Sequence, residues 1–382
     1  MEKGVKNEGG GREEGRGGLY VHVPFCVRKC PYCAFWSEGG SGREERRAWM
    51  RGIRREWERW RRSVEGVEGW RPATVFFGGG TPTALEAGEL EELLGWVRSA
   101  VDVSGVREWS VEANPGTLTG EKASVLVRGG VTRVSVGVQS LDAGTLRRLG
   151  RIHGPVEARA AVEMVRGAGI RHVGADWMYG VPGTAEGVAR RDIEAVAGLE
   201  GVDHVSCYAL EVERGTAFAR RRLRPDEGVQ ARLYEVAREV LRERGFGQYE
   251  LSNWAREGAE CQHNLLYWSG GEYVGLGPGA HSHWKGVRSG NSRGIGRWRR
   301  AFRERLEGER KACETLVFGL RRIAGWGREE FREASGGYEW GQLRGREIRR
   351  LVGEGLLVES GDRLRLAEGA LFVSDVVFRE LV

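Results

Sequence analysis

The sequence predicts an α/β protein, a partial and open (β/α)6 barrel followed by a smaller winged-helix-like α+β domain. Short apolar runs alternate with longer helical stretches, which is typical of parallel βαβ units. Six such units are too few to close an eight-stranded barrel. Each unusual residue cluster follows directly after a predicted strand, where the chemistry of such barrels is located.

The barrel is expected to span residues 19–245. Its six strands are predicted at 19–23, 74–77, 109–112, 133–138, 172–178 and 204–210. Helices are predicted at 42–63, 85–101, 120–128, 143–149, 155–168, 185–197 and 227–244. Residues 1–18 hold mostly glycine and charge, with only Met1 and Val5 apolar, and are expected to form a disordered tail.

The chain after the barrel is expected to form two further parts. Residues 246–310 are predicted to be a linker region, and residues 311–382 a C-terminal domain. In that domain Leu316, Val317, Leu320 and Ile323 recur at helical spacing. Apolar segments at 356–358 and 364–366 flank Ser360-Gly361-Asp362, which is typical of a hairpin. We therefore expect helices with a β-wing.

The composition argues against nucleic acid and against a membrane span. The net charge is +6, but arginine alternates with glutamate at 43–47 and 54–59, which indicates solvated helix faces rather than a phosphate-binding stripe. No apolar run approaches the roughly 18–20 residues of a membrane span. The first residues lack the apolar segment of a secretory signal, so a cytoplasmic protein is expected.

Three of the six cysteines lie within eight residues, at Cys26, Cys30 and Cys33. In a reducing compartment such crowding indicates metal binding rather than disulfides. Three thiolates on one loop can bind three irons of a [4Fe-4S] cluster and leave the fourth iron open for the amino and carboxylate groups of S-adenosylmethionine. The alternative is a structural zinc site with His22 or a distant cysteine as fourth ligand, although no second CxxC pair is present.

A glycine run, Gly78-Gly79-Gly80-Thr81-Pro82, follows the second predicted strand directly. Glycines let a ligand approach the backbone closely and leave N–H and C=O groups accessible. At the end of a strand that lies beside a three-cysteine loop, this run is expected to hold the amino group of the methionine moiety.

These motifs resemble those of the radical SAM coproporphyrinogen-oxidase-like family. The resemblance extends from 20–33 and 78–82 through 111–115, 135–140, 150–153, 176–182 and 249–250, and into the C-terminal domain. One branch is the oxygen-independent coproporphyrinogen III oxidase, and the other is a heme chaperone. The oxidase pattern has a further cysteine two places after the third, where this chain has Phe35. The chaperone pattern carries a His-Asn-x-x-Tyr-Trp box, present here at 263–268.

The resemblance also implies roles for individual residues. Tyr20, Gly79 and Glu112 would contact S-adenosylmethionine, and the ring of Tyr32 would shelter the site. Positions that line a second S-adenosylmethionine site in the oxidase correspond to Gly80, Thr81, Gln139, Arg151, Asp176 and Ala209. No catalytic residue is assigned.

His263 is the predicted heme ligand. A lone histidine is usually hydrogen-bonded or on the surface, but neutral imidazole is a good axial ligand for heme iron. Tyr267 and Trp268 would pack on a porphyrin if this stretch is helical. Cys261 is a rival ligand, and His281 and His283 are either a second ligand or part of a strand-end turn. Cys207 and Cys313 are expected to be buried small hydrophobic residues.

The sequence therefore favours a heme chaperone that carries a [4Fe-4S] cluster, S-adenosylmethionine and heme. It would transfer heme to acceptor proteins such as membrane-bound respiratory enzymes, and a dimer is left open. Two alternatives stay open. One is oxidative decarboxylation of coproporphyrinogen, and the other is a zinc-stabilised binding module.

Overall fold

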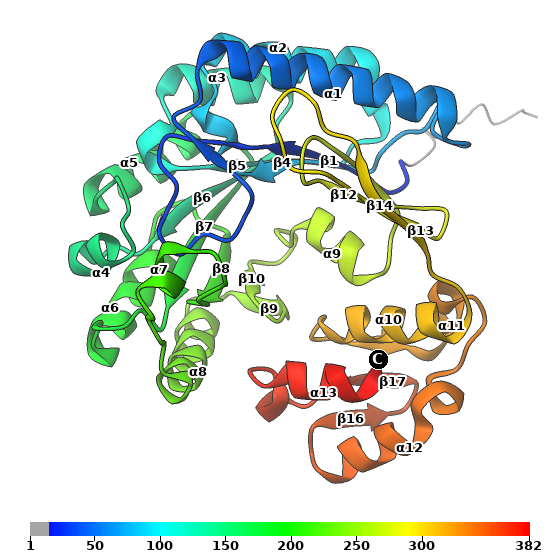
Figure 1. The fold of residues 1–382 in the computed structure, drawn as a ribbon. Helices are drawn as coiled ribbons and strands as arrows, with labels where there is room; N and C mark the ends of the chain where they lie inside the picture. Colours follow the sequence, from blue (N-terminus) through cyan, green and yellow to red (C-terminus); the bar gives the residue numbers. More distant parts are fainter. Residues whose placement is uncertain (1–14) are drawn as a thin grey trace, which may run out of the picture.

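The computed structural model describes residues 15–382, and most of the predicted tail, residues 1–14, lies outside them. One sheet of twelve strands forms the framework, in the order β14-β13-β12-β11-β1-β4-β5-β6-β7-β8-β10-β9 (Figure 1). Residues 15–18, which the sequence placed in the tail, are tied to this sheet. The Arg16 carbonyl accepts from Trp70 Nε1 at 2.6 Å, and Gly18 begins the first strand.

The six predicted strands are confirmed as the parallel centre of the sheet. Each strand is hydrogen-bonded to the next along the chain, which gives an open, partial barrel rather than a closed one. The strands are β1 (Gly18–Val23), β4 (Thr74–Gly79), β5 (Glu108–Ala113), β6 (Arg133–Gln139), β7 (His172–Tyr179) and β8 (His204–Ala209).

Helices cover the outer face of these strands (Figure 1). They are α1 (Arg43–Ser63), α2 (Ala87–Ala100), α3 (Gly120–Gly129), α4 (Ala143–Arg148), α5 (Pro155–Gly167), α6 (Glu186–Ala197) and α8 (Glu227–Glu243). The short helix α7 (Ala217–Arg220) instead contacts the cysteine loop, where the Phe218 N–H donates to the Pro31 carbonyl at 3.0 Å. The longest, α1, buries Trp49, Ile53, Trp57 and Trp60, which share one helical face and pack it onto the sheet.

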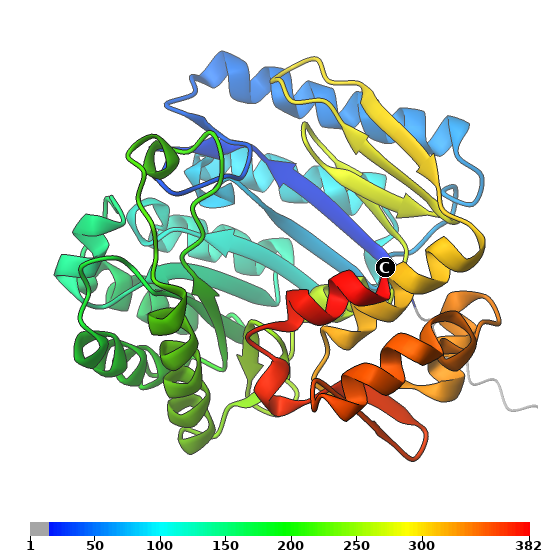
Figure 2. The same cartoon turned by 60° about the horizontal axis from the view of Figure 1, so that its bottom comes forward.

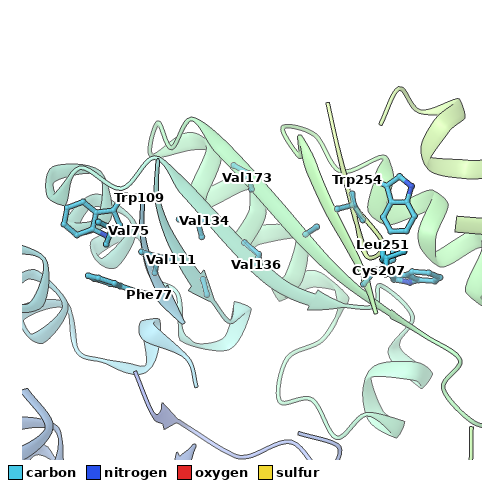
Figure 3. Close-up of a cluster of buried hydrophobic side chains, with 14 of the residues drawn as sticks. Val75, Phe77, Trp109, Val111, Val134, Val136, Val173, Cys207, Leu251 and Trp254 are labelled. Atoms are coloured by element: carbon cyan, nitrogen blue, oxygen red, sulfur yellow. The ribbon is translucent and has the colours of Figure 1, made fainter. Parts of the chain in front are cut away.

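The alternation of side chains along each strand separates an apolar outer face from a polar inner face. On β4, Val75 and Phe77 are fully buried in the outer layer, and Trp109 and Val111 of β5 join them (Figure 3). The intervening inner positions of β5 are the polar Glu108, Ser110 and Glu112, and those of β4 are Thr74, Phe76 and Gly78. A barrel with a polar interior is suited to hold a polar ligand.

Residues 246–310, expected as a linker region, contain six strands of the same sheet and a helix. At one edge, β9 (Gly247–Glu250) and β10 (Asn253–Ala255) continue from β8. At the other edge, β11 (Tyr273–Leu276) pairs in parallel with β1 and is followed by the antiparallel strands β12 (His281–Trp284), β13 (Val287–Asn291) and β14 (Arg300–Arg305). Between these two groups lies α9 (Gln262–Trp268), on the inner side of the sheet (Figure 1).

The C-terminal domain has the predicted helices and β-wing. Its helices are α10 (Gly308–Leu320), α11 (Arg328–Ser335), α12 (Trp340–Gly353) and α13 (Ser374–Leu381). Strands β16 (Leu357–Ser360) and β17 (Arg363–Leu366) form the hairpin, and β15 (Trp326–Gly327) pairs with β17. Figure 2 shows this domain, in orange and red, beside α9 on the open side of the barrel. Among residues 15–382, no helix is long and apolar enough to cross a membrane.

Candidate functional site

The three-cysteine loop leaves the carboxyl end of β1. Cys26 lies on the short strand β2 (Phe25–Cys26), which pairs with β3 (Glu38–Gly39), and the Cys33 N–H donates to the Cys30 carbonyl at 3.1 Å. All three thiols are free and half-buried. Within the described part of the chain, no three potential ligands converge as they would on a single metal ion. The ligands of a cubane cluster bind different irons and therefore stand further apart.

The glycine run positions this loop by pairing with it. The Gly80 N–H donates to the Val23 carbonyl at 2.8 Å, and the Thr81 N–H donates to the Phe25 carbonyl at 2.7 Å. A side chain at Gly80 would stand 2.7 Å from the Val23 carbonyl oxygen, so only glycine allows this approach. Thr81 Oγ1 then lies 3.6 Å from Cys26 Sγ.

Arg151 places a positive charge beside the cysteines. One guanidinium nitrogen donates to Cys30 Sγ and to the Tyr32 hydroxyl, each at 3.3 Å, and the other donates to the Gly137 carbonyl at 2.9 Å. Its Nε is buried and has no partner in residues 15–382. A fixed cation here is suited to hold an anionic group such as a carboxylate, and a buried N–H without a partner is suited to a ligand.

Two carboxylates share the interior next to the glycine run. Glu112 accepts from the Gly79 N–H at 3.0 Å, and Asp176 accepts from the Ser135 hydroxyl at 2.9 Å. Burial, with a smaller contribution from Asp176, raises the pKa of Glu112 to about 7. Burial also raises the pKa of Asp176. A bound group that donates hydrogen bonds or carries positive charge would therefore be stabilised here.

Gln139 combines backbone strain with an unpaired polar atom. Its φ is 63°, in the left-handed region that residues other than glycine rarely adopt, and it lies at an irregularity in the β6–β7 pairing. Its side-chain oxygen is buried without a partner in the described residues. With Arg151 Nε and the two carboxylates, this gives a donor and acceptor set that fits the polar groups of S-adenosylmethionine.

The remaining predicted residues of this site lie around its rim. The Tyr20 hydroxyl donates to His22 Nδ1 at 3.0 Å, and His22 Nε2 donates to the Trp36 carbonyl at 2.9 Å. Both ring nitrogens of His22 are thus engaged, which does not favour His22 as a zinc ligand. Tyr32 packs against Phe218 of α7, with ring centroids 6.2 Å apart. Ala209 ends β8 at the same edge of the sheet.

His263 lies elsewhere, at the amino ends of the strands. Its Nδ1 and the hydroxyl of Thr74, the first residue of β4, are 2.7 Å apart, and its Nε2 lies 2.9 Å from the Tyr267 hydroxyl. The ring also stacks on Phe76 with centroids 5.1 Å apart. Burial lowers its pKa to about 4. Three residues of β4 lie between Thr74 and the glycine run, a distance of roughly 13 Å, and Phe76 among them also stacks on Tyr20.

The start of α9 is fixed by an ion pair that the sequence analysis missed. Glu108 Oε2 pairs with Arg133 Nε at 2.9 Å, and the two carboxylate oxygens also accept from the backbone N–H groups of Gln262 and His263. Burial alone would raise the pKa of Glu108, but Arg133 and the backbone donors outweigh it and lower that pKa. The sequence contains a signal for this ion pair, because Glu108 and Arg133 are each a charged residue at the start of an apolar strand.

The Tyr249-Glu250 motif belongs to the same network. The Tyr249 hydroxyl lies 2.8 Å from His204 Nε2, and it also binds the Asn264 side chain and the Cys261 N–H. Cys261 itself is buried and donates to Glu108 at 3.4 Å. Asn264 therefore holds α9 in place. Cys207 and Cys313 are buried, as expected.

The structure thus brings together the predicted cluster and S-adenosylmethionine residues but not the predicted heme ligand. The cluster and S-adenosylmethionine residues lie where the strands have their carboxyl ends, and we call this the cluster end of the barrel. The α9 end is the opposite one, where the buried network of Glu108, Arg133 and His263 lies.

Comparison with known proteins agrees with this geometry. The family model of the radical SAM superfamily matches residues 20–193, which hold the cysteine loop, the glycine run, Glu112, Gln139, Arg151 and Asp176. The chain is 35% identical over 381 residues to heme chaperone HemW of Mycobacterium tuberculosis (strain CDC 1551 / Oshkosh), covering 96% of this chain and 94% of the relative. Heme chaperone HemW of Escherichia coli (strain K12) is 33% identical, with 94% and 96% covered.

A solved structure shows the same fold across nearly the whole chain. Coproporphyrinogen III oxidase (HemN) from Escherichia coli, described as a radical SAM enzyme, superimposes with a TM-score of 0.79. The match covers 96% of this chain and 90% of the other, at 17% sequence identity. This likeness supports the fold, including the C-terminal domain.

Proposed function

The chain belongs to the heme chaperone HemW family, and from this premise we propose that it binds heme and transfers it to acceptor proteins. The chain spans at least 94% of the length of both bacterial relatives compared above, so the proposal concerns the whole protein. It also carries a radical SAM domain, a family that implies a [4Fe-4S] cluster and S-adenosylmethionine.

The proposal that the protein binds a cluster and S-adenosylmethionine rests on the set of unpaired polar groups around a half-buried cysteine loop. Cys26, Cys30 and Cys33 would hold the cluster, which when bound supplies an electron to the sulfonium of S-adenosylmethionine. Glu112 and Gln139 would then bind polar groups of that ligand. Arg151 would hold its carboxylate while also facing Cys30.

The second part of the proposal concerns heme, the group to be transferred, for which His263 remains a predicted ligand. Both of its ring nitrogens are engaged, one with Thr74 and one with Tyr267. Ligation by His263 would require one of these contacts to break and α9 to expose the ring. Heme binding therefore does not depend on His263 being the ligand.

An anaerobic titration of cluster-reconstituted protein with hemin tests heme binding. We expect a saturable Soret change at a fixed stoichiometry, followed by transfer of heme to an added apo-acceptor. Incubation with coproporphyrinogen and S-adenosylmethionine is the companion assay. Decarboxylation there, without saturable hemin binding, would reject the chaperone function in favour of the oxidase alternative.

The setting of the protein is proposed to be the cytoplasm, with transfer to acceptors such as membrane-bound respiratory enzymes. Fractionation of cells that express the chain tests the first statement. Sedimentation with and without hemin tests whether a dimer forms.

A further inference from the structure

The seven histidines of the chain all lie within the described residues, and they differ in what their ring nitrogens contact. Six have a hydrogen bond or ion pair from the ring, namely His22, His153, His172, His204, His263 and His283. The seventh, His281, has no hydrogen bond from either ring nitrogen within residues 15–382, and it is exposed. Metal ligation needs a free imidazole nitrogen, and His281 offers one without breaking an existing bond.

His281 faces the inner side of the sheet. Tyr273 of β11 contacts Tyr267 of α9 and therefore points inward, and His283 lies directly opposite Tyr273 in the next strand. His281 is two residues before His283 on the same strand, so its side chain points to the same face. Partial desolvation of the ring and the nearby Arg288 lower the pKa of His281, which favours the neutral imidazole that binds iron.

The position of His281 along the strand puts it at the cluster end. It is the first residue of β12, which runs antiparallel to β11, and β11 runs parallel to β1. The turn just before it lies close to the cysteine loop: a Cβ atom at Gly279 would stand only 3.8 Å from Trp36 Cβ. Trp36 is three residues after Cys33 and is tied to His22.

A flat aromatic surface lies beside His281. Its direct neighbour across β13 is Gly290, and the next residue across, on β14, is Phe302, which is 42% exposed. A side chain at Gly290 would stand 2.3 Å from the Phe302 ring, so glycine is needed for this ring to lie over the strand. The His281 and Phe302 rings are 5.3 Å apart at 71°. An axial imidazole stands upright on a porphyrin, so a ring near perpendicular to it is compatible with packing flat on the macrocycle.

From this arrangement we propose that His281 is an axial ligand of the heme iron, with Phe302 packing on the porphyrin over Gly290. The proposal rests on the proposed heme-binding function and names its site. It places the cargo at the cluster end of the barrel, whereas His263 would place it at the α9 end. The ligated group is an iron porphyrin with one open axial position.

The test is a hemin titration of cluster-reconstituted full-length protein and of the variants His281→Ala and His263→Ala. Losing an axial ligand should weaken hemin binding by roughly 10- to 100-fold, the range seen when even an outer-shell partner of a metal ligand is removed. A His281→Gly variant should regain the wild-type Soret band on addition of free imidazole. Circular dichroism and iron content of each variant check folding and cluster loading.

A pair of exposed apolar residues tests the packing surface. Phe302→Ser should weaken hemin binding, whereas Val156→Ser, at a 75% exposed position of the outer helix α5, should not. Loss of binding in His263→Ala with unchanged binding in His281→Ala would overturn the proposal. Unchanged binding in both would overturn it as well, while heme binding itself stands. If the wild-type protein fails to bind hemin saturably, the proposed function fails and this assignment falls with it.

Discussion

Glu108 and Glu112 stand on the same strand and point to the same side, the first buried and the second half-buried, yet their chemistry differs. Glu108, at the α9 end, is paired with Arg133 and with backbone donors, and its pKa is lowered. Glu112, at the cluster end, has one backbone donor and a neighbouring carboxylate, and its pKa rises to about 7. The polar groups of the barrel interior therefore bind one another at the α9 end, whereas those at the cluster end are available to a ligand.

The two ends of the barrel should therefore contribute differently, the α9 end to stability and the cluster end to ligand binding. At the α9 end, removing one partner leaves a buried charge without its counter-charge, although Arg133 already has one N–H, at Nη1, without a partner in residues 15–382. At the cluster end, Gln139 and Arg151 carry buried atoms without a partner among the described residues. Variants at the first end should therefore change unfolding, and variants at the second should change what the protein holds.

The largest effect is expected from the cysteine loop. Cys30→Ser should abolish retention of the cluster, because it removes one of three thiolates, while the secondary structure persists. Iron and sulfide content after anaerobic reconstitution measures this, with Cys313→Ala as a control that removes a buried thiol of the C-terminal domain. Normal iron content in Cys30→Ser would show that this cysteine is not a cluster ligand.

The next effect should follow from breaking the buried ion pair. Glu108→Gln should lower the free energy of unfolding by about 3–5 kcal/mol, because Arg133 keeps its charge without a carboxylate. Chemical denaturation measures this. The double variant Glu108→Leu/Arg133→Met should recover part of the loss, since it removes both charges. A double variant less stable than Glu108→Gln would contradict this account.

The pH dependence of stability should identify Glu112, which has a backbone donor but no cationic partner within residues 15–382. The pKa of Glu112 is about 7 in the folded chain against an ordinary 4.5, so the folded state binds more protons between these values. Stability from this group is present below about pH 4.5 and is lost as the pH rises through 7, by up to about 3 kcal/mol. Unfolding of cluster-free protein across this range should flatten in Glu112→Gln. An equal slope in both proteins would assign the effect to other groups.

The smallest effect should come from the contact between α9 and the C-terminal domain. The Arg321 guanidinium lies 4.4 Å from the centre of the Trp268 ring. Arg321→Gln should lower the unfolding free energy by about 0.5–1 kcal/mol without changing iron content. Thermal unfolding beside an iron assay checks both parts, and a loss of iron would mean that the two ends are coupled.

The sequence predicted the barrel and its cluster end because both depend on local patterns. Apolar strands such as 133–138 and the spacing of Cys26, Cys30 and Cys33 are visible without tertiary structure. The sheet extensions were not visible. Strand β14 is exposed and charged, so it shows no apolar alternation, and β11 and the turn after it contain Gly275, Gly277 and Gly279, which weaken any strand signal.

Whether the His263 box is helical was left open by the sequence; the structure shows that it forms α9, and its place in the barrel was not accessible from sequence. Helix α9 is positioned by Glu108 and Arg133, more than a hundred residues earlier in the chain. A pattern read along the chain cannot show which end of a barrel a later helix will fill. The same limit applies to Asn264, whose partner Tyr249 becomes apparent only when both are seen in space.

The pairing of β1 has a consequence for how the chain is made. Gly18 pairs with Thr74 on one side and with Tyr273, 255 residues later, on the other. A ribosome that adds roughly 5–20 residues per second needs about 13–51 s to cover that interval. During synthesis the cysteine loop therefore emerges long before the strand that completes its sheet. Contacts this distant slow folding, and a chaperone or cluster-assembly factor would meet the loop on an unfinished barrel.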